Sequence, residues 1–191
     1  LYNTTTEILE EFYRSTGGDF WINGSTTWTN RSQSFCLWGG ISCNLNCDVT
    51  SLAIRDNNLT GTIPTSLSNL IKITEIDFSY NHLVKGLSVV GQLPKLKAIF
   101  MSYNKLYEPL PNIISKRVTG ISLFNNLIYG SLRPEYGGLP LRTFIMPNNQ
   151  LSGTIPGEWK NLTQLESINL SNNYLEGIVP DIFSENIYAI D

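Results

Sequence analysis

The chain has 191 residues, of which 41% are hydrophobic and 15% are charged, and its formal net charge is −3. This length suits one domain or one elongated repeat array, and the low share of charged residues predicts a surface that is polar rather than ionic. The 13 lysines and arginines are scattered and no apolar run could span a bilayer, so we expect no nucleic-acid partner and no membrane-spanning segment.

The first predicted element is a short helix in the segment TTTEILEEFYRSTGG, residues 4–18. Thr4 and Glu7 have the spacing of a capping box, in which each side chain accepts a hydrogen bond from the other residue's backbone amide. Gly17 or Gly18 then ends the helix, since glycine readily adopts the left-handed conformation found just after helix ends. The apolar residues at helical spacing predict its buried face: Ile8, Leu9, Phe12 and Tyr13.

Three tryptophans follow the helix within 18 residues, namely Trp21, Trp28 and Trp38. Such a group, if exposed, would suggest a sugar or lipid site. We favour the alternative, in which all three are buried and cover one end of the structure that the rest of the chain forms.

All three cysteines lie in the segment CLWGGISCNLNC, at positions 36, 43 and 47. An odd number cannot all pair within the chain, so one remains free or bonds to a partner outside it. A structural zinc ion needs four ligands, and the single histidine, His82, lies far along the sequence, so we expect no metal. These residues alone leave open which two cysteines pair.

Six segments of one pattern occupy the rest of the chain, with spacings of 22 to 24 residues. Apolar residues recur at positions 1, 4, 6 and 11, Asn at position 9, and usually Gly at 13 and Pro at 16. A truncated seventh segment begins at Ile187. The six complete segments begin at Val49, Ile73, Leu96, Val118, Leu141 and Leu165.

This pattern predicts an α/β repeat solenoid. Positions 4 and 6 alternate with polar neighbours, as in a short strand with one buried face, and stacked copies give a parallel sheet with a continuous core. The Asn at position 9 should satisfy backbone groups in its own repeat and in the next one. The predicted ladder consists of Asn57, Asn81, Asn104, Asn126, Asn149 and Asn173.

The repeats resemble plant-type leucine-rich repeats, which carry the motif L-x-G-x-I-P. LTGTIP at residues 59–64 and LSGTIP at residues 151–156 match that motif fully, whereas Lys85 and Glu108 replace its glycine and GSLRP replaces its end in the fourth repeat. We therefore expect a less regular convex side in repeats two to four. The resemblance implies a right-handed superhelix with a concave parallel sheet, formed by residues 49–191 behind an amino-terminal cap at residues 1–48.

The segment C-x-W-x-G-I-x-C resembles the cysteine pair of the cap that precedes such repeats, which implies a Cys36–Cys43 disulfide. A Cys43–Cys47 bond is the second choice. Cys47 would then lie just before the first repeat, at an open amino-terminal edge of the stack, as a free thiol or a link to another chain.

N-glycosylation sequons and clustered cysteines both favour the secretory route, so we expect a secreted protein or one on the extracellular face of the cell surface. Asn169 falls on a concave strand, where a glycan would confine a ligand to repeats one to five. The sequons begin at Asn3, Asn23, Asn30, Asn58, Asn161 and Asn169.

Outward strand positions bring aromatic and charged residues together on the concave face, as in many binding surfaces. No catalytic motif is present, so we expect neither an enzyme nor a cofactor. We predict an extracellular module that recognises a protein or glycan. The alternative is a structural surface or matrix protein whose copies assemble through their repeat edges. The candidate binding residues are Tyr80, Phe100, Tyr103, Phe124, Ile145, Arg55 and Asp77.

Overall fold

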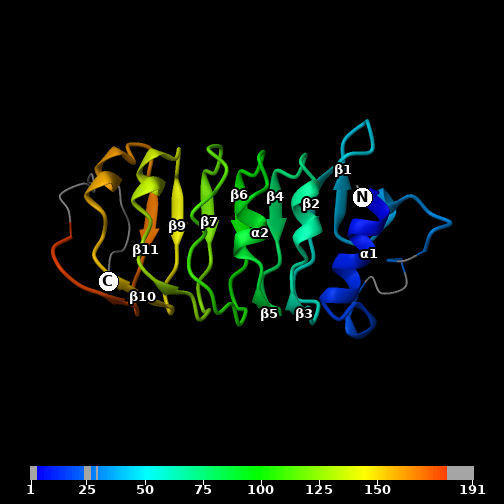
Figure 1. Cartoon of the computed structure of the whole chain (residues 1–191), viewed down its shortest axis with the longest axis horizontal. Coiled ribbons are helices and arrows are strands. Elements are labelled where there is room, and N and C mark those ends of the chain that lie inside the picture. Colours follow the sequence, from blue (N-terminus) through cyan, green and yellow to red (C-terminus); the bar gives the residue numbers. More distant parts are fainter. Residues whose placement is uncertain (1–3, 24–26, 29, 180–191) are drawn as a thin grey trace.

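A seven-stranded sheet runs along the stack of repeats in the computed structural model, which describes residues 4–23, 27–28 and 30–179 (Figure 1). Each repeat supplies one strand, and the position-4 residues of all six pair in register and are buried. The predicted repeat solenoid is therefore confirmed. The parallel strands are β2 (Val49–Ala53), β4 (Glu75–Asp77), β6 (Ala98–Phe100), β7 (Gly120–Ser122), β9 (Thr143–Ile145) and β11 (Ser167–Asn169).

Further strands form a second edge of the stack, and their pairing breaks at the third repeat. One small sheet contains β3 and β5, and the other contains β8, β10 and β12. The third repeat contributes only an isolated bridge between Pro109 and Tyr129. This break lies within the repeats that depart from the motif. The strands are β3 (Thr60–Thr62), β5 (His82–Lys85), β8 (Tyr129–Gly130), β10 (Gln150–Gly153) and β12 (Tyr174–Leu175).

A short helix follows the second-edge strand in several repeats, and the second repeat has α2 (Leu87–Gly91) where the first, fourth and fifth have a 3₁₀ helix. The start of α2 depends on Glu108, whose Oε1 accepts hydrogen bonds from the backbone nitrogens of Gly86 (2.5 Å) and Leu87 (2.8 Å). Glu108 stands where the motif has glycine, and its carboxylate caps the helix of the neighbouring repeat. The 3₁₀ helices are Gly18–Phe20, Phe35–Leu37, Thr65–Asn69, Pro134–Gly138 and Gly157–Asn161.

The asparagines of position 9 form a hydrogen-bonded ladder, but those of repeats two to six reach back to the preceding repeat. Asn57 of the first repeat reaches back to Asn23 of the cap. Asn104 donates to the carbonyls of Phe78 (2.9 Å) and Met101 (3.1 Å) and accepts from the backbone nitrogen of Leu83 (2.9 Å). Phe78 and Leu83 belong to the second repeat, so the expectation of bonds to the next repeat was wrong. The carbonyl of position 6 lies beyond the end of the strand pairing and accepts from two asparagines, that of its own repeat and that of the following one. The carbonyl of Phe78, for example, accepts from Asn81 (3.0 Å) and from Asn104 (2.9 Å).

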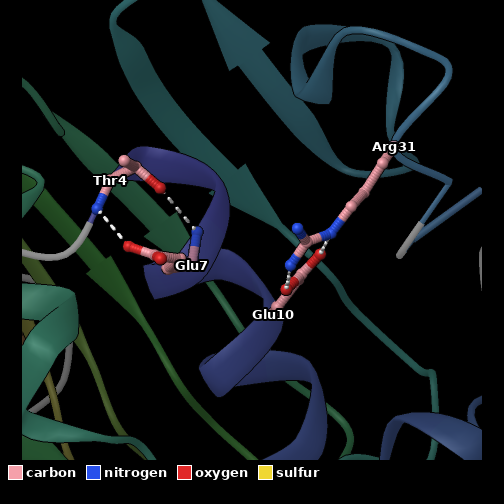
Figure 2. A network of polar contacts seen from close by, with 4 residues as sticks. All are labelled: Thr4, Glu7, Glu10 and Arg31. Atoms are coloured by element: carbon pink, nitrogen blue, oxygen red, sulfur yellow. Dashed lines mark hydrogen bonds and ion pairs between the residues drawn. The ribbon is translucent and has the colours of Figure 1, made fainter.

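The cap begins with α1 (Thr5–Ser15), which starts and ends as predicted. The backbone nitrogen of Thr4 donates to Glu7 Oε2 (2.7 Å), and the backbone nitrogen of Glu7 donates to Thr4 Oγ1 (3.3 Å), which completes the capping box (Figure 2). Gly17 follows the helix with φ of 72°, a conformation that glycine adopts without a steric cost. The residues of the predicted apolar face are all buried: Ile8, Leu9, Phe12 and Tyr13.

The three cap tryptophans are buried, which confirms the packing interpretation. Trp28 is 1% exposed, and its ring centroid lies 4.9 Å from that of Trp21 and 5.5 Å from that of Trp38. Phe12 of α1 stacks on Phe78 of the second repeat at 5.2 Å. One aromatic cluster therefore joins the cap to the first repeats, and its rings are not available to a sugar or lipid.

The disulfide of the cap links Cys36 to Cys43, with Cα atoms 5.6 Å apart. Cys47 is exposed and lies in the turn that joins β1 (Ile41–Cys43) to β2. The expectation of an open edge beside Cys47 was wrong, because β1 pairs antiparallel with β2 and covers that edge. The first strand of the stack therefore has its backbone groups satisfied within the chain. Ile187 and the sequon at Asn3 lie outside the described residues.

An ion pair fixes α1 to the loop that follows it (Figure 2). The Arg31 guanidinium donates two hydrogen bonds to the carboxylate of Glu10, at 2.8 Å from Nε and 2.6 Å from Nη2. Glu10 is buried, whereas Arg31 is exposed. These hydrogen bonds from Arg31 hold the pKa of Glu10 below its usual range.

Because folding lowers the pKa of Glu10, its contribution to stability is present above the unfolded pKa of about 4.3 and is lost as the pH falls through the folded value. We expect Glu10→Gln to lower the thermal midpoint at pH 7 and to have a smaller effect at pH 3, which lies below the unfolded pKa. Thermal unfolding of both proteins at the two pH values measures this difference. Arg31→Gln should behave in the same way, and an equal loss at both pH values would contradict the assignment.

Candidate functional site

Three aromatic side chains, Tyr80, Tyr103 and Phe124, form a continuous row across repeats two to four, which we call the aromatic row. The rings of Tyr80 and Tyr103 stack with centroids 4.5 Å apart, and Phe124 meets Tyr103 at 4.9 Å in an edge contact. Arg55 of the first repeat places its guanidinium carbon 4.6 Å from the centroid of the Tyr80 ring. Four repeats thus contribute one side chain each to a single surface feature.

The two tyrosines of the row occupy a backbone conformation that bulky residues rarely adopt. Position 8 is left-handed in every repeat, with φ of 59° at Tyr80 and 54° at Tyr103. Repeats four to six carry asparagine there, which tolerates this conformation far better than tyrosine. Both tyrosines are nevertheless 41% exposed. A strained and exposed aromatic pair is typical of a functional surface rather than of packing.

A hollow of about 330 Å³ lies on the strand side of the aromatic row. Asp77 in this hollow accepts a hydrogen bond from the backbone nitrogen of Ser79 (3.0 Å), and the hydroxyls of Ser102 and Ser122 are 3.0 Å apart. The lining of this hollow therefore combines hydroxyl groups with one carboxylate. The lining residues are Arg55, Asp77, Ser79, Tyr80, Phe100, Ser102, Ser122 and Phe124.

A larger hollow of about 570 Å³ lies on the other side of the two tyrosines, and its lining includes Ile22 from the cap. The cap loop is held there by hydrogen bonds from the backbone nitrogen of Ile22 to the Asn57 carbonyl (3.3 Å) and from Asn58 Nδ2 to the Phe20 carbonyl (3.0 Å). The remaining lining residues are Asp56, Asn58, Tyr80, Asn81, His82, Tyr103, Asn104, Lys105 and Asn125.

Sequence reasoning missed this second hollow. His82 and Lys105 occupy position 10 of their repeats and are not among the binding residues predicted from the sequence. The available signal was the buried asparagine at position 9, because its neighbours at positions 8 and 10 both point away from the core. The contribution of Ile22 had no such signal, since it depends on how the cap folds against the repeats.

Most of the predicted concave residues meet at these hollows, but Ile145 does not. Phe100, Ser122, Ile145 and Asn169 pair in register across neighbouring strands, so Ser122 separates Phe100 from Ile145. Neither hollow is lined by Ile145.

The described sequon asparagines lie in different settings. Asn169 lies on the sheet, where its Oδ1 accepts hydrogen bonds from Ser171. Asn23 and Asn161 are exposed, and Asn30 and Asn58 are half-buried.

Among the described residues, no helix is long and apolar enough to cross a membrane. In the same part of the chain, no three residues of the types His, Cys, Asp and Glu are placed to hold a metal ion.

Comparison with known proteins identifies the family. One model described as a leucine-rich repeat matches residues 48–106, and a second of the same description matches residues 140–162 and 164–186. Together they cover more than half of the chain. The chain belongs to the leucine-rich-repeat family. This agrees with the resemblance found in the L-x-G-x-I-P segments.

Similar proteins include plant receptors, of which this chain matches only a part. Receptor-like protein 41 of Arabidopsis thaliana is 32% identical over 135 residues, which are 68% of this chain and 15% of that protein. The plant peptide hormone receptor RGFR1 in complex with RGF2 is 33% identical, with a TM-score of 0.64 over 66% of this chain and 21% of that chain. A chain of the BIR3–SERK2 complex of Arabidopsis thaliana is 27% identical, with a TM-score of 0.70, and the match covers 88% of this chain and 95% of that chain.

The leucine-rich-repeat chain spans only 14% to 19% of the length of three curated relatives. It therefore resembles the repeat-containing part of plant receptors.

Proposed function

We propose that this leucine-rich-repeat chain is an extracellular recognition module that binds a protein or peptide over repeats one to four. The aromatic row carries this proposal. Its two tyrosines keep a strained conformation while exposed, and a hollow lies on each side of them. Large, rigid side chains beside hollows are the residues that contribute most to binding energy in protein interfaces.

The geometry of the row favours a protein partner over a glycan. Sugars bind aromatic residues by lying on a free ring face. In the row, Arg55 covers one face of Tyr80 and Tyr103 covers the other, while Phe124 and Tyr103 meet in an edge contact. The stacked tyrosines therefore offer mainly their edges and hydroxyl groups, which suit hydrogen bonds and edge contacts with a polypeptide.

The relatives support the same class of partner. RGFR1 is a receptor in complex with RGF2, and BIR3 and SERK2 form a complex with each other. We propose that this chain likewise binds a polypeptide at the cell surface or outside the cell, and that its exposed sequons carry N-linked glycans. Assembly of copies through repeat edges has less support, because β1 already covers the amino-terminal edge. A catalytic role is not part of this proposal.

A displayed library of random peptides, selected on the immobilised protein, tests the location of binding. Benzoylphenylalanine is placed at Phe124 in the aromatic row or, as a matched control, at the exposed Tyr174 of β12. We expect peptides selected on the wild-type protein to cross-link at Phe124 several-fold more than at Tyr174. Failure to select any peptide, or cross-linking mainly at the control position, would contradict the proposal.

A further inference from the structure

Residues that break the repeat pattern gather in one cavity on the second edge of the stack, where β3, β5 and β10 lie along the lower side of Figure 1. Lys85 and Glu108 stand where the motif has glycine, and Ser88 and Arg133 stand where it has proline. All four line a cavity of about 420 Å³, although they come from three different repeats. Such convergence is not expected if the departures are independent losses of a motif.

Folding explains part of this cavity but not all of it. Glu108 caps α2, so its carboxylate already has partners. Lys85 is exposed and forms no ion pair with any described residue. Tyr107 and Tyr129 also line the cavity, with ring centroids 4.9 Å apart, and remain 57% and 38% exposed. These three side chains contribute little to the core.

The two tyrosines belong to an exposed row of their own, at position 12 of the repeats. Val84, Tyr107 and Tyr129 occupy that position in repeats two to four, and we call them the edge row. The flanking repeats carry polar residues there, namely Thr60, Ser152 and Glu176. An apolar strip confined to three neighbouring repeats and bordered by polar ones is a feature of interaction surfaces.

The cavity also holds a positioned cation. Arg133 donates from Nε (3.0 Å) and Nη2 (2.7 Å) to the carbonyl of Leu110, which fixes the guanidinium plane. Its Nη1 has no hydrogen-bond partner among the described residues, and Lys85 lines the same cavity. A guanidinium held in place and a free ammonium form a receptor for a carboxylate, since little side-chain freedom is lost at Arg133 on binding.

We propose that this edge is a second binding site, separate from the aromatic row, for an acidic segment of a protein partner. The segment places an Asp or Glu carboxylate between Lys85 and Arg133 and apolar side chains on the edge row. The unpaired cations determine the acidic character of the partner. The valine and tyrosines of the edge row favour a polypeptide over an acidic polysaccharide, which has no apolar side chains to place there.

The test selects a displayed random-peptide library on the Tyr80→Ala/Tyr103→Ala variant, in which the aromatic row is disabled. We expect the recovered peptides to be enriched in Asp or Glu next to apolar residues. Their affinity should fall at least tenfold on Lys85→Gly, which restores the motif residue, and on Tyr107→Ser. Raising the salt concentration should weaken the same peptides, because a carboxylate contact near the surface is screened.

A matched control is Lys105→Gln, which removes an exposed cation in the other hollow and should change affinity less than twofold. The proposal is overturned if no peptide is recovered, if recovered peptides show no acidic enrichment, or if Lys105→Gln weakens them as much as Lys85→Gly. Because the bait lacks the aromatic row, these outcomes are independent of the proposed function. Far-UV circular dichroism of each variant verifies that the repeats remain folded.

Discussion

Replacing Asn104 with alanine is expected to lower the free energy of unfolding by about 4 kcal/mol, measured by equilibrium denaturation in urea. The side chain is 9% exposed and satisfies three backbone groups, namely the carbonyls of Phe78 and Met101 and the nitrogen of Leu83. In the variant the buried nitrogen of Leu83 loses its partner, which costs about 1–3 kcal/mol. The carbonyls of Phe78 and Met101 each lose one of their hydrogen bonds, at about 0.5–1.5 kcal/mol each, although Asn81 and Asn126 still donate to them. The loss is concentrated where the second and third repeats meet.

Asn173 provides the matched control for this change. It makes the corresponding hydrogen bonds to Met146, Leu170 and Leu151, but it is only half-buried. Water can replace its amide, so Asn173→Ala should cost about 1–2 kcal/mol. Equal losses at the two positions would show that burial of the ladder is not what makes it stabilising.

Trp28→Ala is expected to have an effect of similar size, a loss of about 3–5 kcal/mol, because it leaves a large cavity in the cap. The Trp28 ring contacts Phe12, Tyr13, Trp21 and Trp38, and its Nε1 donates to the carbonyl of Gly39 at 2.8 Å. Far-UV circular dichroism measures the transition, since the substitution removes a fluorescent group. The variant should unfold at lower urea because the aromatic cluster joins the cap to the repeats.

Phe20→Ala is the control for the cap, because Phe20 is also aromatic but 76% exposed. Its removal should change stability by no more than about 0.5 kcal/mol. A loss below about 1.5 kcal/mol in Trp28→Ala would contradict the view that the tryptophan cluster holds the cap in place.

The parts of the fold that repeat in the sequence were predictable. Six copies of one pattern place Leu52 and Ile76 at equivalent buried positions, and stacking follows from their shared apolar face. The capping box of Thr4 and Glu7 likewise predicts the start of α1, because it depends only on neighbouring residues. The direction of the Asn ladder was not predictable, since it depends on which way the unpaired carbonyls face after the sheet has formed. The strand Ile41–Cys43 was missed because three residues give too short a pattern.

The candidate site was predictable to the extent that it lies within single repeats. Tyr80, Tyr103 and Phe124 converge because positions 7 and 8 recur at fixed spacing. The stacking of the two tyrosines and the position of Arg55 over the Tyr80 ring could not be predicted, since neither follows from the spacing of residues in the sequence. Ile145 was included because its position in the repeat is correct, but an intervening Ser122 separates it from Phe100.

The central claim is that the aromatic row contributes most of the binding energy for a polypeptide partner. Isothermal titration of a peptide that was selected on the wild-type protein and that cross-links at Phe124 measures this directly, by comparing its affinity for wild type and for Tyr80→Ala/Tyr103→Ala. We predict a loss of at least about 30-fold in the double variant, as for residues at the centre of an interface. Tyr174→Ala, which removes a 72% exposed tyrosine outside the row, should leave the affinity within about twofold. Equal affinity for the wild type and the double variant would contradict the claim.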